Sequence, residues 1–342
     1  MKKILAIFLC FISAMSLSAQ QKKAIDKVKF FEEDKILKAT LSTNMNKLLG
    51  GKGKEGDSTS GNFTFFFTDS NAVKENITVT IRGNFRRKNC FIAPVRIEFR
   101  KPNSTYAALG SLKLVSACKT GDQYEDYLLA EYLIYKIYNL FTEKSFRIRL
   151  LELTYHDSTN RRKDFTNHAF LIEDSKDMAR RNKMAEWKNP RVLTEQTDRE
   201  QMTLVAIFEY MIGNTDWSVP ALHNIRLICD KAEKTPIPYA VPYDFDYCGL
   251  VNAEYAEPYE ELGIENIRQR LYRGYPRTME ELNRTLQVFK GKKEKIYGLV
   301  SGFTLLGKTK QREIINYLDE FYDIISRPKD VESIFIKNAR KD

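Results

Sequence analysis

Two short polar clusters contain the residue types that phosphoryl transfer needs. The first runs from Asp216 to Asn224, and the second contains Asp244 and Asp246 about 20 residues later. Phosphoryl transfer requires a carboxylate beside the acceptor hydroxyl and hard oxygen ligands for a divalent metal. The pattern therefore predicts that Asp216 holds the acceptor and takes its proton. The predicted metal ligands are Asn224, Asp244 and Asp246.

Plainer interpretations of these residues stay open. A single aspartate such as Asp216 is typical of a helix cap or a loop. Asp244 and Asp246 also fit an Asx turn at the end of a strand, or a structural calcium site. The order of the two clusters, with a predicted strand hairpin between them, favours the catalytic interpretation.

A transferase of this kind also needs cations on the nucleotide phosphates. Lys113 lies in the middle of an alternating segment, and Glu131 follows 18 residues later on a predicted helix. A strand lysine paired with a helix glutamate clamps these phosphates in protein kinases. Arg96 is a rival cation, and the turn Arg82-Gly83-Asn84 could offer backbone N–H groups to phosphate. The structural alternatives are a solvated edge-strand lysine and a plain hairpin turn.

Local patterns predict the elements that must position these residues. Alternation of apolar and polar residues predicts strands, and apolar residues spaced by four predict helices. The helices are expected at 125–141, at 199–212 with Gly213 as the C-cap, and repeatedly over 257–336. The strands are expected at 77–81, 95–99, 111–115, 146–151, 169–172, 224–229 and 239–241. A strand-rich first part followed by a mainly helical second part is typical of an α+β protein.

Several of these pieces together resemble the spore-coat protein H (CotH) kinase family of atypical secreted protein kinases. They are the stretch from Arg82 to Arg86, the strand of Lys113, Asp216-Trp217 with Asn224, and Tyr243 to Asp246. The pieces Gly213 to Asp216 and Pro242 to Asp244 also resemble HipA-type bacterial kinases. The likeness covers residues 77–250.

The resemblance implies ATP and Mg²⁺ or Mn²⁺ as cofactors, and transfer to serine or threonine hydroxyls of a secreted or surface protein. It also implies a two-lobed protein-kinase-like fold. The strand-rich N-lobe is expected over 76–174 and the mainly helical C-lobe over 175–342.

The sequence also departs from the family pattern. The spacing from Asp216 to Asn224 is longer than in the usual protein-kinase loop, and the segment 89–94 replaces the paired lysines and serines that follow the arginine-glycine turn in CotH proteins. The alternative interpretation is therefore an inactive pseudokinase that acts as a binding or assembly protein at the cell surface or in the periplasm.

The first 19 residues have the features of a secretory signal peptide. Lys2 and Lys3 precede an apolar run over 4–15, and small residues close the segment at Ala19. The apolar run is too short for a helix that spans a bilayer. We therefore expect export to the periplasm or the extracellular space. Residues 20–75 are expected to form an N-terminal extension with a flexible glycine-rich loop.

Composition narrows the function classes further. The 342 residues are 43% hydrophobic, which excludes a mainly disordered chain. A net charge of +10 suits a phosphate-bearing ligand, but it is too low for a dedicated nucleic-acid binder. We expect neither a nucleic-acid partner nor a transmembrane segment. The cysteine spacing favours the pairs Cys90–Cys118 and Cys229–Cys248, with four buried free thiols as the alternative.

Overall fold

The computed structural model describes residues 26–49, 53–68, 71–83, 85–99, 106–189 and 191–341. The predicted signal peptide lies outside these ranges, and so does Asn84 of the predicted phosphate-binding turn. Within them, no helix combines the length and the apolar character that crossing a membrane requires.

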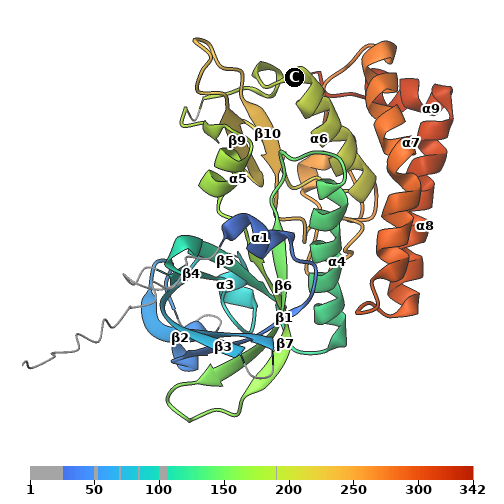
Figure 1. The fold of residues 1–342 in the computed structure, drawn as a ribbon. Coiled ribbons are helices and arrows are strands. Elements are labelled where there is room, and N and C mark those ends of the chain that lie inside the picture. The colour runs from blue at the N-terminus through green and yellow to red at the C-terminus, as the bar shows by residue number, and fades with distance from the viewer. Residues whose placement is uncertain are drawn as a thin grey trace, which may run out of the picture.

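Seven strands close into a barrel in the order β1–β2–β3–β4–β5–β7–β6 (Figure 1). Neighbouring strands are antiparallel, except that β1 pairs with β6 in parallel and so closes the barrel. The strands are β1 (Leu37–Thr43), β2 (Ser58–Thr68), β3 (Asn71–Ile81), β4 (Val95–Phe99), β5 (Gly110–Ser116), β6 (Ile148–Asp157) and β7 (Phe165–Ile172).

Alternate side chains of these strands fill the barrel, as the two-residue period of a strand requires. Phe63, Phe65 and Phe99 are all buried there, and the rings of Phe65 and Phe99 stack with centroids 5.9 Å apart. The barrel interior is one of two hydrophobic cores. The second core belongs to the helical part and to the outer side of β5, β6 and β7.

The closed barrel overturns the predicted two-lobed protein-kinase-like fold, whose N-lobe has an open sheet. The error arose in residues 20–75, because β1 and β2 lie where a flexible extension was expected. Gly61, which suggested a loop, lies in β2 against β1. A Cβ atom there would lie 2.6 Å from the carbonyl oxygen of Ser42, so this glycine permits a close approach of two strands.

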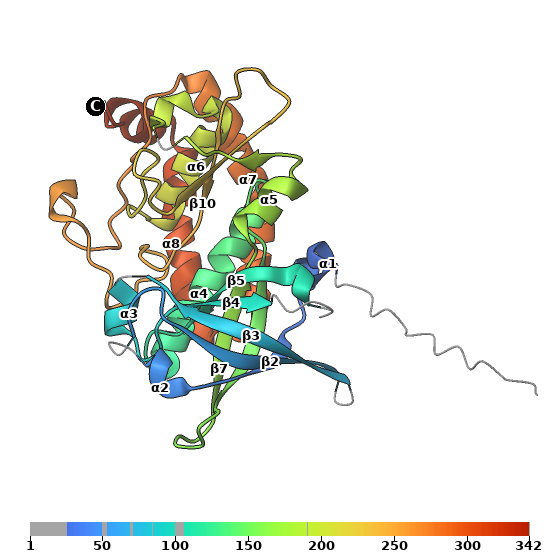
Figure 2. The ribbon, with the colours of Figure 1, turned by 90° about the vertical axis from the view of Figure 1, so that its left-hand side faces the viewer.

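Helices and a small sheet form the rest of the molecule (Figures 1 and 2). The small sheet has the order β10–β9–β8, with β8 at Ala185–Glu186, β9 at Ile225–Cys229 and β10 at Tyr239–Pro242. The α-helices are α1 (Lys27–Glu32), α2 (Met45–Leu48), α3 (Phe85–Asn89), α4 (Asp122–Asn139), α5 (Ser175–Arg181), α6 (Arg199–Ile212), α7 (Met279–Gly302), α8 (Lys308–Ser326) and α9 (Pro328–Glu332).

Helix α4 lies between the barrel and the helices α7 and α8 (Figure 1). It contacts β6 and β7 on one side and α7 on the other. Twelve of its 18 residues are buried, so α4 lacks the broad solvent-exposed face of a surface helix. The helices predicted at 125–141 and 199–212 are confirmed as α4 and α6.

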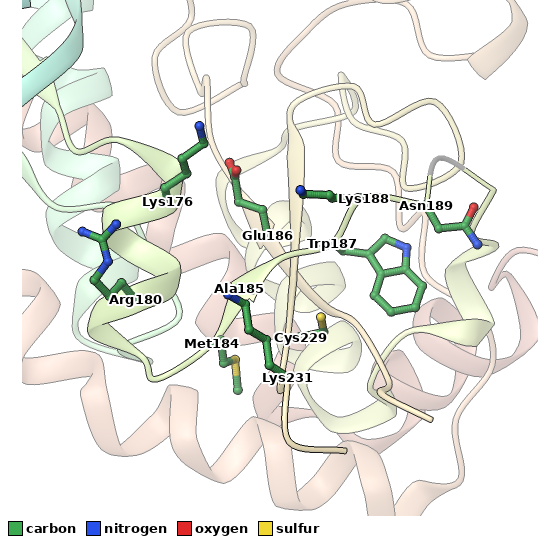
Figure 3. Close-up of a pocket in the computed structure, with 10 residues that line it drawn as sticks. All are labelled: Lys176, Arg180, Met184, Ala185, Glu186, Trp187, Lys188, Asn189, Cys229 and Lys231. Atoms are coloured by element: carbon green, nitrogen blue, oxygen red, sulfur yellow. The ribbon is translucent and has the colours of Figure 1, made fainter. Parts of the chain in front are cut away.

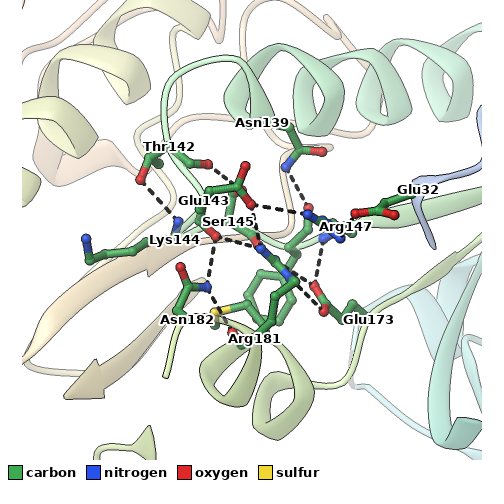
Figure 4. A network of polar contacts seen from close by, with 12 residues as sticks. Glu32, Asn139, Thr142, Glu143, Lys144, Ser145, Arg147, Glu173, Arg181 and Asn182 are labelled. Carbon is green, nitrogen blue, oxygen red and sulfur yellow. Dashed lines mark hydrogen bonds and ion pairs between the residues drawn. The ribbon is translucent and has the colours of Figure 1, made fainter. Parts of the chain in front are cut away.

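A polar network joins α5 to the turn between α4 and β6 (Figure 4). The Arg181 guanidinium donates to both carboxylate oxygens of Glu173, at 3.1 and 3.0 Å, and to the backbone oxygen of Ser145 at 2.8 Å. Glu173 also accepts from the Arg147 N–H at 3.1 Å. The side chains of Arg181 and Glu173 are only 9% and 6% exposed, so each charge depends on the other.

We predict that Arg181→Met lowers the free energy of unfolding by about 3 kcal/mol, because it leaves the Glu173 carboxylate buried without its partner. Arg180→Met is the matched control. The Arg180 side chain is 75% exposed in its ion pair with Asp177, so its loss should cost less than about 1 kcal/mol. Urea denaturation followed by circular dichroism measures both variants. Equal effects would contradict the role given to this network.

Candidate functional site

Asp216 lies in the loop that leaves α6. Gly213 ends this helix in the left-handed conformation, with φ of 67°, which glycine adopts without strain. The side-chain amide of Asn224 donates to the Asp216 backbone oxygen at 2.7 Å and to its Oδ2 at 3.0 Å. His223 Nε2 lies 2.7 Å from Asp216 Oδ1. Asn224 and His223 therefore help to hold the Asp216 carboxylate in one orientation.

The β9–β10 ribbon brings Asn224 and Asp244 together. The N–H of Tyr243, which precedes Asp244, donates to the backbone oxygen of Asn224 at 3.0 Å. Asn224 and Asp244 both have left-handed backbones, with φ of 51° and 68°. Such conformations are uncommon for residues other than glycine and concentrate at functional sites. Tyr135 on α4 supports the turn, because its hydroxyl accepts from the Asp244 N–H at 2.8 Å.

The oxygen atoms of these two residues fit a magnesium-type ion. The Asn224 amide nitrogen faces Asp216, so its Oδ1 is not used in that contact. No described side chain or backbone group donates a hydrogen bond to the Asp244 carboxylate. Magnesium is commonly bound by one or two carboxylates together with substrate phosphates. The described residues contain no group of three or more His, Cys, Asp or Glu side chains that could hold a metal.

Asp246 has a different environment from Asp244. Its Oδ2 lies 3.8 Å from Arg86 Nη1 and accepts from the Tyr255 hydroxyl at 3.1 Å. Arg86 Nη1 also lies 4.0 Å from Glu131 Oε2, and Nη2 donates to the Ser116 backbone oxygen at 2.6 Å. Burial raises the pKa of Asp246 to about 6 and raises the pKa of Glu131 well above its usual value, although Arg86 opposes both shifts.

The structure does not show the predicted pairing of Lys113 with Glu131. The structure gives Glu131 a different cation, Arg86, which belongs to α3 and not to a strand. Lys113 Nζ instead lies over the Tyr243 ring, 4.4 Å from its centroid. Burial, followed by the charge of Arg82, lowers the pKa of Lys113 to about 8.

Lys113 is one of four cationic side chains that lie close enough to interact with one another. Arg82 and Lys113 both interact electrostatically with Asp244, and burial lowers the pKa of Arg82 as well. Arg96 lies directly opposite Lys113 in the β4–β5 pair, and its exposed side chain adds a further positive charge. Arg226 on β9 lies over the same Tyr243 ring as Lys113, 4.7 Å from the centroid.

The turn at Arg82-Gly83 is described only in part. Gly83 has φ of 79°, and its backbone oxygen accepts from Arg87 Nε at 3.1 Å. Binding of phosphate by the backbone N–H groups of this turn stays a prediction.

A pocket of about 400 Å³ opens beside Asp216. His223 and Tyr259 line it, and the Tyr259 hydroxyl donates to Asp216 Oδ1 at 3.1 Å. Arg273 borders the same pocket and holds the loop, because its Nη1 donates to the backbone oxygens of Thr215 and, at 2.9 Å, Trp217. The Asp216 carboxylate is therefore reachable by a side chain that enters from solvent.

Two of the four cysteines in the described part of the chain are paired. Cys90 and Cys118 form a disulfide, which ties the end of α3 to the segment after β5. This predicted pair is confirmed. The predicted pair Cys229–Cys248 is wrong, because both are buried free thiols.

Sequence reasoning missed a buried carboxylate behind the Asp216 loop. Glu209 Oε2 accepts from Asn214 Nδ2 at 2.9 Å, and Asn214 Oδ1 accepts from the Asp216 N–H at 2.9 Å. Burial raises the pKa of Glu209 to about 8. The available signal was the one acid within the mainly apolar stretch 202–212 of α6. Arg86 was harder to find, because it lies in a run of basic residues that is typical of a solvated surface.

Comparison with known proteins adds no family. No protein-family model matches this chain, and neither does any curated protein.

We predict that Glu209→Gln stabilises the protein relative to wild type as the pH rises from about 4.5 to about 8. The folded state binds the Glu209 proton more tightly than the unfolded state, whose pKa is near 4.5, so wild-type stability falls across this interval. Glutamine keeps the shape and has no charge to bury. Urea denaturation at several pH values measures the difference between the two proteins. A difference that does not change with pH would contradict the raised pKa.

Proposed function

We propose that the protein is a secreted phosphotransferase that transfers a phosphoryl group from a metal-bound nucleotide to a hydroxyl of a protein substrate. The crowding of Arg82, Arg96 and Arg226 around Lys113, with Asp244 as the nearby carboxylate, carries this proposal. Burial first, and then the neighbouring positive charges, lower the pKa of Lys113, so its charged form is destabilised in this environment. A polyphosphate would relieve it. Perturbed groups of this kind concentrate at functional sites.

Nucleotide binding is assigned to the barrel side of the site. Lys113 and Arg82 are partly buried cations that can hold phosphate oxygens. The Arg96 side chain, beside Lys113, is exposed to solvent. Asn224 and Asp244 would hold Mg²⁺ or Mn²⁺, which neutralises charge on the phosphates of ATP. Asp246 and Glu131 stay with Arg86 and keep the turn in place.

Asp216 acts on the acceptor. A serine or threonine hydroxyl entering the pocket beside Asp216 transfers its proton to the carboxylate. The acceptor oxygen forms a bond to the γ-phosphorus as the bond from that phosphorus to the leaving ADP oxygen breaks. Asn224 and His223 keep the carboxylate aimed, which matters because small errors in position slow such reactions strongly. The export of the enzyme is proposed from residues 1–19 of the sequence.

We predict that the protein incorporates label from γ-labelled ATP with Mn²⁺, and that Asp216→Asn and Asp244→Asn each reduce the rate by at least about 100-fold. Autoradiography with a generic protein acceptor measures the transfer. Asp323→Asn changes an exposed carboxylate on α8 and is the matched control, which should retain full activity. Equal incorporation by all four proteins, or none by wild type, would end the enzymatic proposal.

A second candidate function is nucleotide binding without transfer, in a surface binding or assembly protein. The absence of the Lys113–Glu131 pair favours it, because active protein kinases use that pair to hold the phosphates.

We predict that saturating ATP with Mg²⁺ raises the melting temperature, because a ligand that binds only the folded state stabilises it. Lys113→Met combined with Asp244→Asn should abolish the shift. A shift without label transfer identifies the binding protein. A shift with calcium alone that this double variant loses would point to a structural calcium site at Asp244.

A further inference from the structure

A second pocket, of about 560 Å³, lies between α5, β8 and the end of β9 (Figure 3). We call it the basic pocket. Lys176 and Arg180 border it from α5, and Lys188 and Lys231 border it from the segments after β8 and β9. Glu186 is the one acidic residue among those that line it.

The charges of the basic pocket are not balanced within the protein. The ammonium groups of Lys176, Lys188 and Lys231 are exposed and have no hydrogen bond or ion pair to any part of the chain that the structure describes. Arg180 differs, because it donates to Asp177 at 2.8 Å. Glu186 accepts from the Ser175 hydroxyl. The lining of the basic pocket therefore has three unpaired lysines and one carboxylate that already has a partner.

The basic pocket also runs along the end strand of the small sheet. β8 pairs with β9 on one side, and no described strand pairs with its other side. The N–H of Trp187 donates to the Leu227 oxygen at 2.8 Å. Because partners alternate in an antiparallel ladder, the backbone N–H and C=O of Glu186 point away from β9. An extended peptide can add to such an edge through its backbone.

We propose that the basic pocket binds an extended acidic segment of a protein partner. Its carboxylates pair with the three lysines, its backbone adds to the free side of β8, and its apolar side chains cover the half-buried Trp187 ring.

The basic pocket lies at the opposite end of β9 from Asn224. Five residues of strand correspond to about 16 Å. An acidic segment about five residues from the acceptor hydroxyl can therefore occupy the basic pocket while the acceptor reaches Asp216. This role in substrate selection rests on the proposed function, whereas binding of the acidic segment does not.

Fluorescence anisotropy with a labelled short peptide of alternating Glu and Val tests the binding. We expect Lys188→Glu with Lys231→Glu to weaken binding by about tenfold or more, and raised salt to weaken wild-type binding. Lys290→Glu with Lys295→Glu on α7 makes the same change of charge at exposed positions that do not line the basic pocket, and should change affinity by less than about twofold. Circular dichroism confirms that both variants are folded.

Two results would overturn the proposal. One is equal affinity of the pocket variant and wild type for the Glu-Val peptide. The other is binding of the matching Gln-Val peptide, or of a labelled single-stranded DNA of equal length, as tightly as the acidic peptide.

A kinetic measurement then separates the two proposals. With an acceptor peptide that carries the acidic segment, the pocket variant should raise KM and leave kcat unchanged. If no protein transfers phosphate but the peptide still binds in the basic pocket, the proposed function fails and the present inference stands.

Discussion

The arrangement of this protein depends on a half-buried cation, Arg86, held between two buried carboxylates. Arg86 lies between Asp246 and Glu131, and these three residues come from α3, the loop after β10 and α4. Removing one member of such a group leaves uncompensated charge in a low dielectric, which costs several kcal/mol. The barrel, the central helix and the ribbon loop must therefore meet in one geometry. The Cys90–Cys118 disulfide adds a covalent tie directly after α3.

That constraint separates two aspartates that are only two residues apart. Asp246 points into the group around Arg86, where burial raises its pKa to about 6. Asp244 lies in a left-handed turn supported by the Tyr135 hydroxyl and is left to face Arg82 and Lys113. The same loop thus supplies one structural carboxylate and one that is available to a ligand. Asp244 is available to a ligand because Arg86 neutralises Asp246 and not Asp244.

The Asp216 loop is supported in a different way. Glu209 and Asn214 form a short chain of hydrogen bonds behind it, and Asn224 fixes its carboxylate from the front. Asn224 therefore links both halves of the candidate site. Its side-chain amide donates to Asp216, and its backbone oxygen accepts from the N–H of Tyr243, the residue before Asp244. Rigid positioning of this kind is what a transfer reaction with little covalent chemistry requires.

The sequence by itself determined the local elements and the neighbourhood of Asp216, Asn224 and Asp244. The strand 95–99 and the helix 199–212 were predicted with the bounds that the structure has, because alternation and helical spacing are properties of neighbouring residues. Only the tertiary structure decided that β1 and β6 close a barrel, that Glu131 pairs with Arg86 instead of Lys113, and that Cys229 and Cys248 stay apart. These outcomes join residues that are distant in the chain, and they depend on burial and on charges acting through space, which a linear pattern does not contain.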